Sequence, residues 1–219
     1  DRVVVSAPAS LAFKWLPRML ADIQADDGGL RFELRMENDP VNFGDHGPDL
    51  RIGYGDLPYT GLARETLVQD YLLPLCAPSE AVPPPSALAS EQVIHTSWGA
   101  SYASLPGWRD WAALAGVEPP DPRGGQAAAA PSLSLEMAMA GMGIVLGNAL
   151  FACGDLAAGR LAVPFGPALP LPARYMLCFR KRQPQLQRLA EALARRAERD
   201  VAEVLESRLP PEAGKARPG

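Results

Sequence analysis

The sequence predicts an α/β fold in two lobes, and three observations support this prediction. The first 55 residues alternate between short apolar runs, which are typical of strands, and helical patterns, an order that implies parallel strand pairing. A second alternation of strands and helices begins at about residue 92. Between the two, the proline-rich segment 78–85 is typical of a rigid connector. We therefore expect a lobe boundary near that segment.

Three strands and one helix are predicted within the first 55 residues. The β-branched run at residues 3–6 indicates a buried strand, and residues 30–36 alternate between apolar and charged side chains, which indicates a half-buried one. A third strand at residues 49–55 ends in glycines. Apolar residues between 11 and 23 form a single helical stripe. Ser10 directly precedes this stripe and is well placed to cap the helix.

The remaining elements are predicted from shorter patterns. Residues 126–130 are rich in alanine, which favours a helix, but five residues between a glycine and a proline suit a strand better. Residues 208–219 are rich in proline, glycine and charge, so we expect a disordered tail. The other predicted elements are a polar turn and helix at 38–47, strands at 62–68, 71–76, 92–95, 143–146 and 175–179, and helices at 108–115, 133–140, 149–158 and 185–206.

Composition and charge exclude several classes of function. The net charge of −4 argues against a surface dominated by phosphate contacts, because nucleic-acid-binding domains normally carry a basic stripe. No apolar run reaches the roughly 18 residues that a membrane span requires. Cys76, Cys153 and Cys178 are widely separated and lack any metal-binding spacing, so we expect reduced thiols, a cytoplasmic location and no metal site.

Motifs for catalysis or cofactor binding are missing. The two histidines, His46 and His95, fall in different predicted lobes, and neither belongs to a known catalytic motif. The segment Gly141-Met142-Gly143 follows a helix and enters a strand, which is the reverse of the order in a dinucleotide-binding loop. It therefore predicts the C-terminal cap of a helix. We expect no catalytic residue, no cofactor and no enzyme activity.

Two serines stand at predicted helix starts, one in each lobe. Ser10 and Ser132 would each be an ordinary helix cap, contributing ~1 kcal/mol to the stability of its own helix. A helix N-terminus also presents unpaired N–H groups and attracts anions. In an α/β protein, ligands bind where the carboxyl ends of strands and the starts of helices converge. The pattern therefore predicts a site for a carboxylate or another anionic or polar group.

Four segments in register resemble the effector-binding domain of LysR-type transcriptional regulators, in the branch of the glycine-cleavage activator and the β-lactamase regulators. Residues 49–55, Asp-Leu-Arg-Ile-Gly-Tyr-Gly, look like that branch's Asp-Leu-Ala-Ile-Arg-Tyr-Gly. Residues 138–147 are similar to its Ala-x-x-Gly-x-Gly-Val-Ala-Leu-Gly. The other two segments are residues 4–19 and residues 156–165. The resemblance extends to about residue 205.

This resemblance implies a fold with two Rossmann-like lobes, of the periplasmic-binding-protein type II, with a cleft between them. Lobe I would comprise residues 1–73 and 167–207, and lobe II residues 74–166. The resemblance also implies a small-molecule effector in the cleft, a homodimer formed through the regulatory lobes, and DNA contact only through an N-terminal domain that this chain lacks. By position, the implied ligand-binding residues are Ala9, Ser10, Asn38, Asp39, Ser132, Leu133 and Tyr175.

One departure from the family bears on the ligand. Many relatives carry Asp-Ser-Ser where this chain has Ala130-Pro131-Ser132. Since Pro131 has no N–H and Ala130 has no polar side chain, this wall offers fewer hydrogen bonds. The effector could therefore differ from that of the relatives, or the pocket could be only partly functional.

Three other interpretations stay open at this point. A solute-binding protein of a transport system shares the fold, an enzyme could use it, and a subunit-contact module could lack a ligand altogether. For a dimer, the sequence suggests the helices at 11–23 and 135–141, which are rich in leucine, methionine and tryptophan.

Overall fold

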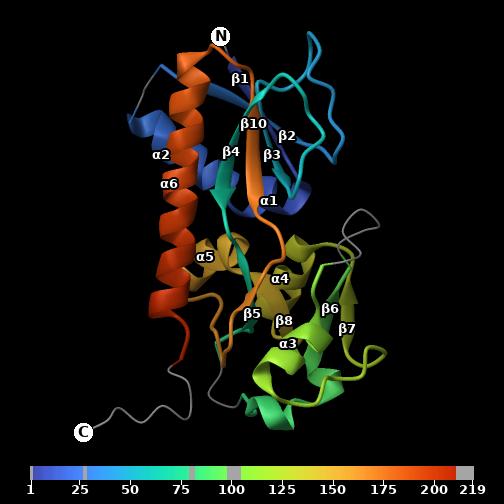
Figure 1. Ribbon diagram of the computed structural model, residues 1–219. Coiled ribbons are helices and arrows are strands. Elements are labelled where there is room, and N and C mark those ends of the chain that lie inside the picture. The colour runs from blue at the N-terminus through green and yellow to red at the C-terminus, as the bar shows by residue number, and fades with distance from the viewer. Residues whose placement is uncertain (1, 27–28, 79–81, 98–104, 211–219) are drawn as a thin grey trace, which may run out of the picture. The chain divides into compact units, whose positions relative to one another are not determined.

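The computed structural model describes residues 2–26, 29–78, 82–97 and 105–210 (Figure 1). The chain forms two compact units: unit 1 comprises residues 1–70 and 172–201, and unit 2 comprises residues 71–171 and 202–219. The described residues of the proline-rich segment 78–85 thus belong to unit 2, and the first change of unit falls between Asp70 and Tyr71. Of the expected disordered tail, residues 211–219 lie outside the described residues.

Unit 1 is a five-stranded sheet with helices. The strand order is β2-β1-β3-β10-β4, in which β1 is parallel to β2 and β3, whereas β10 is antiparallel to β3 and β4. The elements are β1 (Arg2–Ala7), α1 (Ala9–Lys14), α2 (Leu16–Asp26), β2 (Arg31–Met36), β3 (Leu50–Tyr54), β4 (Ala63–Val68), β10 (Tyr175–Phe179) and α6 (Pro184–Ser207), whose residues from 202 on are part of unit 2.

Unit 2 repeats this topology. Its strand order is β7-β6-β8-β5-β9, with β6 parallel to β7 and β8 and with β5 antiparallel to β8 and β9. The second strand in the order, β6, therefore corresponds to β1, and the edge strand β7 corresponds to β2. The elements are β5 (Tyr71–Leu75), β6 (Val93–Thr96), α3 (Trp108–Ala115), β7 (Gln126–Ala128), α4 (Pro131–Met139), β8 (Ile144–Asn148), α5 (Ala149–Ala157) and β9 (Leu169–Pro170), with 3₁₀ turns at Pro85–Ala87 and Ser90–Gln92.

Most predicted elements are confirmed, because their patterns are local. The strand at residues 126–128 is present, as its short span between a glycine and a proline indicated. The helix predicted at 108–115 has those limits, and Gly116 ends it in the left-handed conformation with φ 69°. Gly141 also has a positive φ of 76°, and the N–H of Met142 donates to the carbonyl of Met137 at 3.0 Å. This pattern confirms the predicted C-terminal cap at Gly141-Met142-Gly143.

The single helix predicted for residues 11–23 is wrong in one respect: it is two helices that break at Trp15. Pro17 has no N–H to donate to the preceding turn, so it is tolerated only in the first turn of a new helix. The Trp15 indole N–H donates to the carboxylate of Asp200 on α6 at 2.9 Å, and the Arg18 guanidinium lies 3.1 Å from the same oxygen. The break between α1 and α2 is thereby fixed to α6.

The helix predicted within residues 38–47 is also wrong. This segment is an irregular loop in which the N–H of Gly47 donates to the carbonyl of Gly44 at 2.9 Å. A Cβ atom on Gly47 would lie 2.1 Å from the carbonyl oxygen of Asn42, so only glycine allows this tight fold of the loop. The composition of the segment, with prolines at both ends, favours such a turn over a helix.

The apolar stripe of the first helices faces the core of unit 1, which corrects the expectation that it forms a dimer surface. Leu11, Trp15, Leu16 and Met19 have no exposed surface, and Leu135 and Ala138 of α4 are equally buried. Among the residues that the structure describes, the exposed large apolar side chains are Phe13, Met36, Leu114, Leu133 and Met142. Within the two predicted segments, Phe13 is exposed and Met137 and Met139 are half-buried, so an association surface there would involve these side chains.

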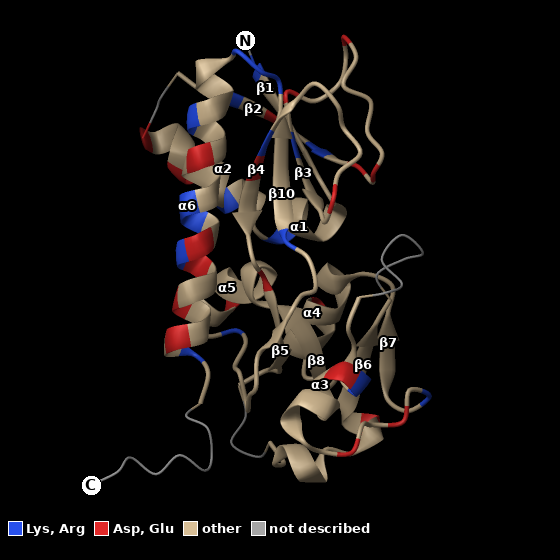
Figure 2. Cartoon of the chain, in the orientation of Figure 1, with Lys and Arg blue, Asp and Glu red and all other residues tan. Residues whose placement is uncertain are grey.

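The described part of the chain contains no helix with the length and apolar composition that a membrane crossing requires. Charges of both signs alternate along α6, so its arginines form no continuous basic stripe (Figure 2). Cys76, Cys153 and Cys178 are buried free thiols, as their spacing predicted.

Candidate functional site

Sheet topology identifies one edge of unit 1 as the place where a ligand would bind. The chain passes from β1 to β2 on one side and then to β3 on the other side of β1, so the strand order reverses between β1 and β3. In open α/β sheets, ligands bind outside the carboxyl ends of the strands at such a switch point. Five predicted site residues lie at this edge: Ala9 and Ser10 after β1, Asn38 and Asp39 after β2, and Tyr175 opposite the last residue of β3.

Ser10 is not the cap that the sequence suggested. The residue preceding α1 is Pro8, no side chain caps the helix, and Ala9 and Ser10 are its first two residues. Ser10 is 6% exposed, so its hydroxyl is packed at the switch-point edge. Ser132 occupies the same second position in α4, after Pro131 and the uncapped Ala130. The two serines thus share a helix position, the second residue of α1 and of α4, and neither is the N-cap residue of its helix.

An aromatic pair borders the switch point of unit 1. The rings of Tyr175 and Tyr54 meet edge to face, with centroids 5.3 Å apart and an interplanar angle of 65°. The Tyr54 hydroxyl accepts a hydrogen bond from the N–H of Ala173 at 3.0 Å, and burial raises the pKa of the phenol above its usual value of 10.0. Tyr175 is 4% exposed. The two tyrosine side chains therefore border this side of the site with uncharged rings, buried for Tyr175 and half-buried for Tyr54.

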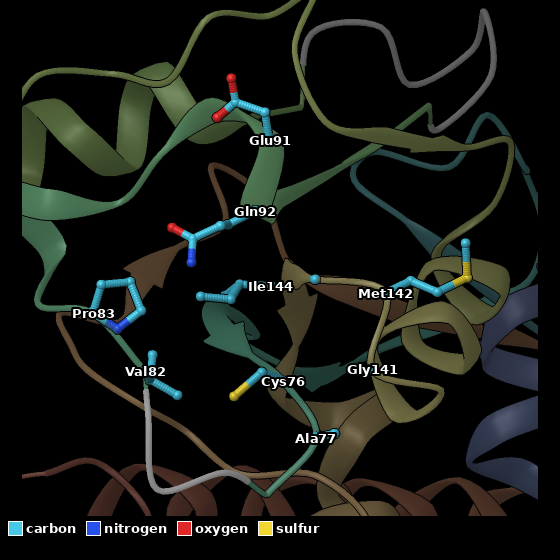
Figure 3. A pocket seen from close by; sticks show the side chains of 10 residues that line it. Cys76, Ala77, Val82, Pro83, Glu91, Gln92, Gly141, Met142 and Ile144 are labelled. Atoms are coloured by element: carbon cyan, nitrogen blue, oxygen red, sulfur yellow. The ribbon is translucent and has the colours of Figure 1, made fainter.

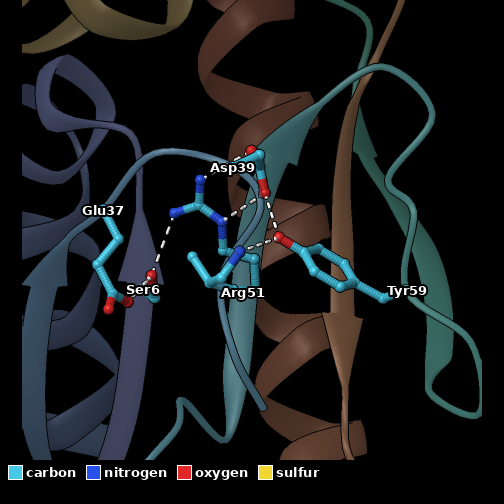
Figure 4. Close-up of polar contacts among 6 residues, drawn as sticks. Ser6, Glu37, Asp39, Arg51 and Tyr59 are labelled. Atoms are coloured by element: carbon cyan, nitrogen blue, oxygen red, sulfur yellow. Dashed lines mark hydrogen bonds and ion pairs between the residues drawn. The ribbon is translucent and has the colours of Figure 1, made fainter.

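A buried arginine crosses the switch point itself (Figure 4). Arg51 on β3 has no exposed surface and is paired in register with Ser6 on β1. Its guanidinium binds both carboxylate oxygens of Asp39, with Nε at 3.2 Å and a terminal nitrogen at 2.9 Å, and it donates to the Ser6 hydroxyl at 3.1 Å. The ion pair is bidentate and largely desolvated, the geometry in which an arginine binds a carboxylate most strongly.

The Ser6 and Tyr59 hydroxyls extend this network to the loop after β2. Ser6 donates to the Glu37 carboxylate at 2.5 Å. The Tyr59 hydroxyl donates to Asp39 at 2.5 Å and accepts the N–H of Val41 at 2.7 Å. Burial and the hydrogen bond to the Asp39 carboxylate raise the pKa of Tyr59 to about 12, so the phenol stays protonated at neutral pH. The predicted site residue Asp39 is thus committed to the protein's own network, whereas Asn38 beside it is exposed.

The corresponding edge of unit 2 is less polar. Ser132 is partly buried and Leu133 is 49% exposed, while the Ser134 hydroxyl donates to the carbonyl of Pro131 at 2.9 Å within the helix. The switch point of this sheet lies between β6 and β8. At the end of β6, the buried atoms Nε2 of His95 and Oγ1 of Thr96 have no hydrogen-bond partner among the described residues.

Residue patterns alone missed Ser6, Glu37, Arg51, Tyr59 and Thr96. One signal for Arg51 was present, because in the segment that resembles Asp-Leu-Ala-Ile-Arg-Tyr-Gly the arginine stands two residues early and Gly53 occupies its usual place. A Cβ atom on Gly53 would lie 2.6 Å from the Leu57 side chain and 3.0 Å from the Asp39 carboxylate. The glycine therefore leaves room for the carboxylate that Arg51 binds.

A cavity of about 400 Å³ lies at the opposite end of the unit 2 sheet, before β6 and β8 (Figure 3). Cys76 lines it together with Gln92, Met142 and Ile144. Burial raises the pKa of the Cys76 thiol, which makes the thiol less reactive. Within the described residues, no three His, Cys, Asp or Glu side chains are grouped so that they could hold a metal ion.

The sequence profile of the LysR substrate binding domain matches residues 1–198. This chain belongs to that family. It is therefore the effector-binding domain of a LysR-type regulator, and since these are regulatory domains, the expectation that the chain is not an enzyme is confirmed. The match also favours a regulator over the solute-binding protein that the sequence left open.

Similar proteins agree with this assignment. The chain is 25% identical over 193 residues to the glycine cleavage system transcriptional activator of Escherichia coli K12, covering 86% of this chain and 61% of the relative. It is 28% identical over 171 residues to the HTH-type transcriptional regulator TrpI of Pseudomonas aeruginosa, covering 74% and 56%. The chain thus spans about three fifths of the length of the curated relatives that it matches.

The effector domain of the regulator AmpR of Pseudomonas aeruginosa has the same fold, with a TM-score of 0.69 at 22% identity over 94% of this chain and 99% of that one. The expectation of two Rossmann-like lobes of the periplasmic-binding-protein type II is thereby confirmed. At this level of identity, the likeness concerns the fold alone.

Proposed function

We propose that this domain senses a small polar or anionic effector and thereby modulates the activity of a DNA-bound LysR-type regulator. The observation that carries the proposal is the gathering of Ala9, Ser10, Asn38, Asp39 and Tyr175 at the switch point of unit 1. In unit 2, Ser132 and Leu133 at the start of α4 are the proposed effector contacts. DNA contact would belong to a separate N-terminal domain, and the regulator would act in the cytoplasm.

The two serines would hold the anionic part of the effector. Each charge-assisted hydrogen bond contributes ~1.5–3 kcal/mol, whereas an exposed helix start adds only ~0.3–1 kcal/mol. Because α1 has just six residues, most of the contribution at Ser10 would come from its hydroxyl and the adjoining N–H groups. After the cost of association, such contacts support dissociation constants of roughly micromolar to millimolar. Pro131 keeps the affinity toward the weaker end, because it lacks an N–H.

The experiment is a thermal-shift screen of the 219-residue chain against amino acids, mono- and dicarboxylates and phosphorylated sugars, followed by calorimetric titration of each compound that raises the melting temperature. Ser10→Ala and Ser132→Ala should each weaken binding at least five-fold. Ser134→Ala is the matched control, since its hydroxyl already donates to the carbonyl of Pro131 within α4. Unchanged affinity in both test variants would contradict the proposed roles of the serines.

The regulatory domain would also form a homodimer, the commonest symmetric assembly. In unit 1, Phe13 and Met36 are 63% and 66% exposed, and Met36 ends the edge strand β2. Single exposed apolar side chains are common on monomeric proteins, so Phe13 and Met36 serve as probes of this proposed surface rather than as evidence for it. Phe13→Glu should shift the sedimentation coefficient toward that of a monomer, whereas Leu114→Glu in unit 2 serves as a control. A wild-type chain that stays monomeric at high micromolar concentration would contradict this part of the proposal.

A further inference from the structure

The carboxylate of Glu37 lies at the switch point of unit 1. This residue directly follows β2, and its N–H donates to the carbonyl of Ala7 at 3.0 Å, which places it beside the chain that enters α1. Its carboxylate accepts the hydroxyl proton of Ser6, which is fully buried on β1. The side chain itself is only partly buried. One carboxylate oxygen of Glu37 thus accepts a hydrogen bond from a buried residue of the sheet, and the side chain stays partly accessible to solvent.

The local charge balance leaves this carboxylate without a counter-ion. The bidentate contact between Arg51 and Asp39 neutralises both of those groups. Ser6 then connects Arg51 to Glu37 through hydrogen bonds, because its hydroxyl accepts from the guanidinium and donates to the carboxylate. Among the described residues, no lysine, arginine or histidine forms an ion pair with Glu37. The network therefore carries one net negative charge, located on Glu37 at its accessible end.

The residues that create this arrangement depart from the sequences that the chain resembles. Arg51 stands where the similar segment has alanine, and Gly53 stands where it has arginine. Gly53 leaves space for Asp39, and Asp39 then holds Arg51 beneath Ser6. A buried arginine at this position orients the Ser6 hydroxyl so that its proton points to Glu37. Compared with the similar segment, β3 therefore has no arginine at position 53. Arg51 instead orients the Ser6 hydroxyl, which binds the Glu37 carboxylate.

From this we infer that Glu37 recognises an ammonium group of the effector, and that the effector is an amino acid. This inference rests on the proposed function, in which Ser10 of the same unit holds an anionic group of the same molecule. A free amino acid carries both a carboxylate and an ammonium group, and it therefore satisfies both ends of the site. Glu37 is the specificity-determining residue for the cationic end, and Ser6 and Arg51 position it.

The test uses the common L-amino acids and glycine as probes, together with the N-acetyl derivative of each one that binds, in calorimetric titrations of the 219-residue chain. Acetylation removes the ammonium charge and keeps the carboxylate and the side chain. For the wild type, acetylation should weaken binding at least ten-fold. Glu37→Gln should weaken binding of the free amino acid at least ten-fold but change binding of its N-acetyl derivative less than three-fold.

The matched control is Glu198→Gln, which makes the same change in charge at an exposed position on α6 and should leave both affinities unchanged. Urea denaturation of each variant verifies that the fold is intact. The inference is overturned if no amino acid binds, or if Glu37→Gln weakens the free and the acetylated ligand equally or neither. A carboxylate without an amino group whose binding depends on Ser10 would overturn this inference and leave the proposed function standing.

Discussion

The residues that follow the equivalent edge strands β2 and β7 differ in polarity between the two units. After β2 in unit 1 the chain reads Glu37-Asn38-Asp39, and after β7 in unit 2 it reads Ala129-Ala130-Pro131. In unit 1, the carboxylates join a network with Ser6, Arg51 and Tyr59. In unit 2, the corresponding residues offer no polar side chain, and two buried polar atoms at the end of β6 have no partner among the described residues.

This difference bears on the proposed effector site. A satisfied polar network is rigid and presents a fixed charge, so unit 1 can set which chemistry binds. The small apolar residues after β7 offer no charge and no side-chain hydrogen bond that would select the chemistry of a ligand. We therefore expect substitutions in the unit 1 network to change stability and specificity strongly, and equivalent substitutions in unit 2 to act weakly or in the opposite direction.

The largest effect is expected for Asp39→Ala, which leaves the fully buried Arg51 guanidinium without its carboxylate. Breaking a buried ion pair by removing one partner costs about 3–5 kcal/mol, and the midpoint of urea denaturation followed by circular dichroism measures this loss. The control is Asp56→Ala, because Asp56 pairs with Arg64 at 3.4 Å but its side chain is 98% exposed. Exposed pairs contribute about 0–1 kcal/mol. Equal losses in the two variants would contradict the importance of the network.

A smaller loss is expected for Gly53→Ala. The added Cβ would lie 2.6 Å from a Leu57 methyl and 3.0 Å from an Asp39 carboxylate oxygen, so both side chains must shift. Overpacking of this kind costs about 1–3 kcal/mol. Gly107→Ala in unit 2 meets no atom within 4 Å and should cost less than about 1 kcal/mol. Thermal melting of the two variants decides the point, and a larger drop for Gly107→Ala would refute the fit between Gly53 and Asp39.

A gain in stability is expected for Thr96→Val in unit 2. The Thr96 hydroxyl oxygen is buried without a described partner, and replacing such a group by an apolar isostere removes a desolvation penalty of about 1 kcal/mol or more. In unit 1, Thr66→Val removes the contact of its hydroxyl with the Met176 sulfur at 3.8 Å and should be neutral or slightly destabilising. A rise in the melting temperature for the Thr96 variant alone supports the contrast between the units. A fall for it would mean that the hydroxyl is satisfied in solution.

The smallest effect concerns pH. The pKa of Tyr59 is raised to about 12 in the folded protein, compared with 10.0 for an unperturbed phenol. The protonated hydroxyl that bonds Asp39 therefore contributes stability that is complete below pH 10 and is lost as the pH rises toward 12. Tyr59→Phe should show a shallower decline of unfolding free energy between pH 9 and pH 11.5. Identical slopes for the variant and the wild type would show that the hydroxyl is not coupled to folding.

Much of the fold followed from local patterns in the sequence. The alternation of strands and helices, the end of α3 at Gly116 and the cap at Gly141 all depend on residues within a few positions of one another. The helices predicted at residues 11–23 and 38–47 were wrong, although local signals for the actual structure were present in the sequence. Pro17 and the glycines of the 38–47 loop already indicated the break and the turn.

The sequence by itself determined the α/β class, the parallel pairing in each half of the chain and the family, because periodicity and short motifs are preserved along the chain. Only the tertiary structure decided the chemistry of the site. Arg51 meets Asp39 across 12 positions of sequence and Ser6 across 45, and Tyr59 reaches Asp39 across 20. No local pattern encodes such contacts, since they exist only after β1, β2 and β3 have assembled side by side and buried the arginine between them.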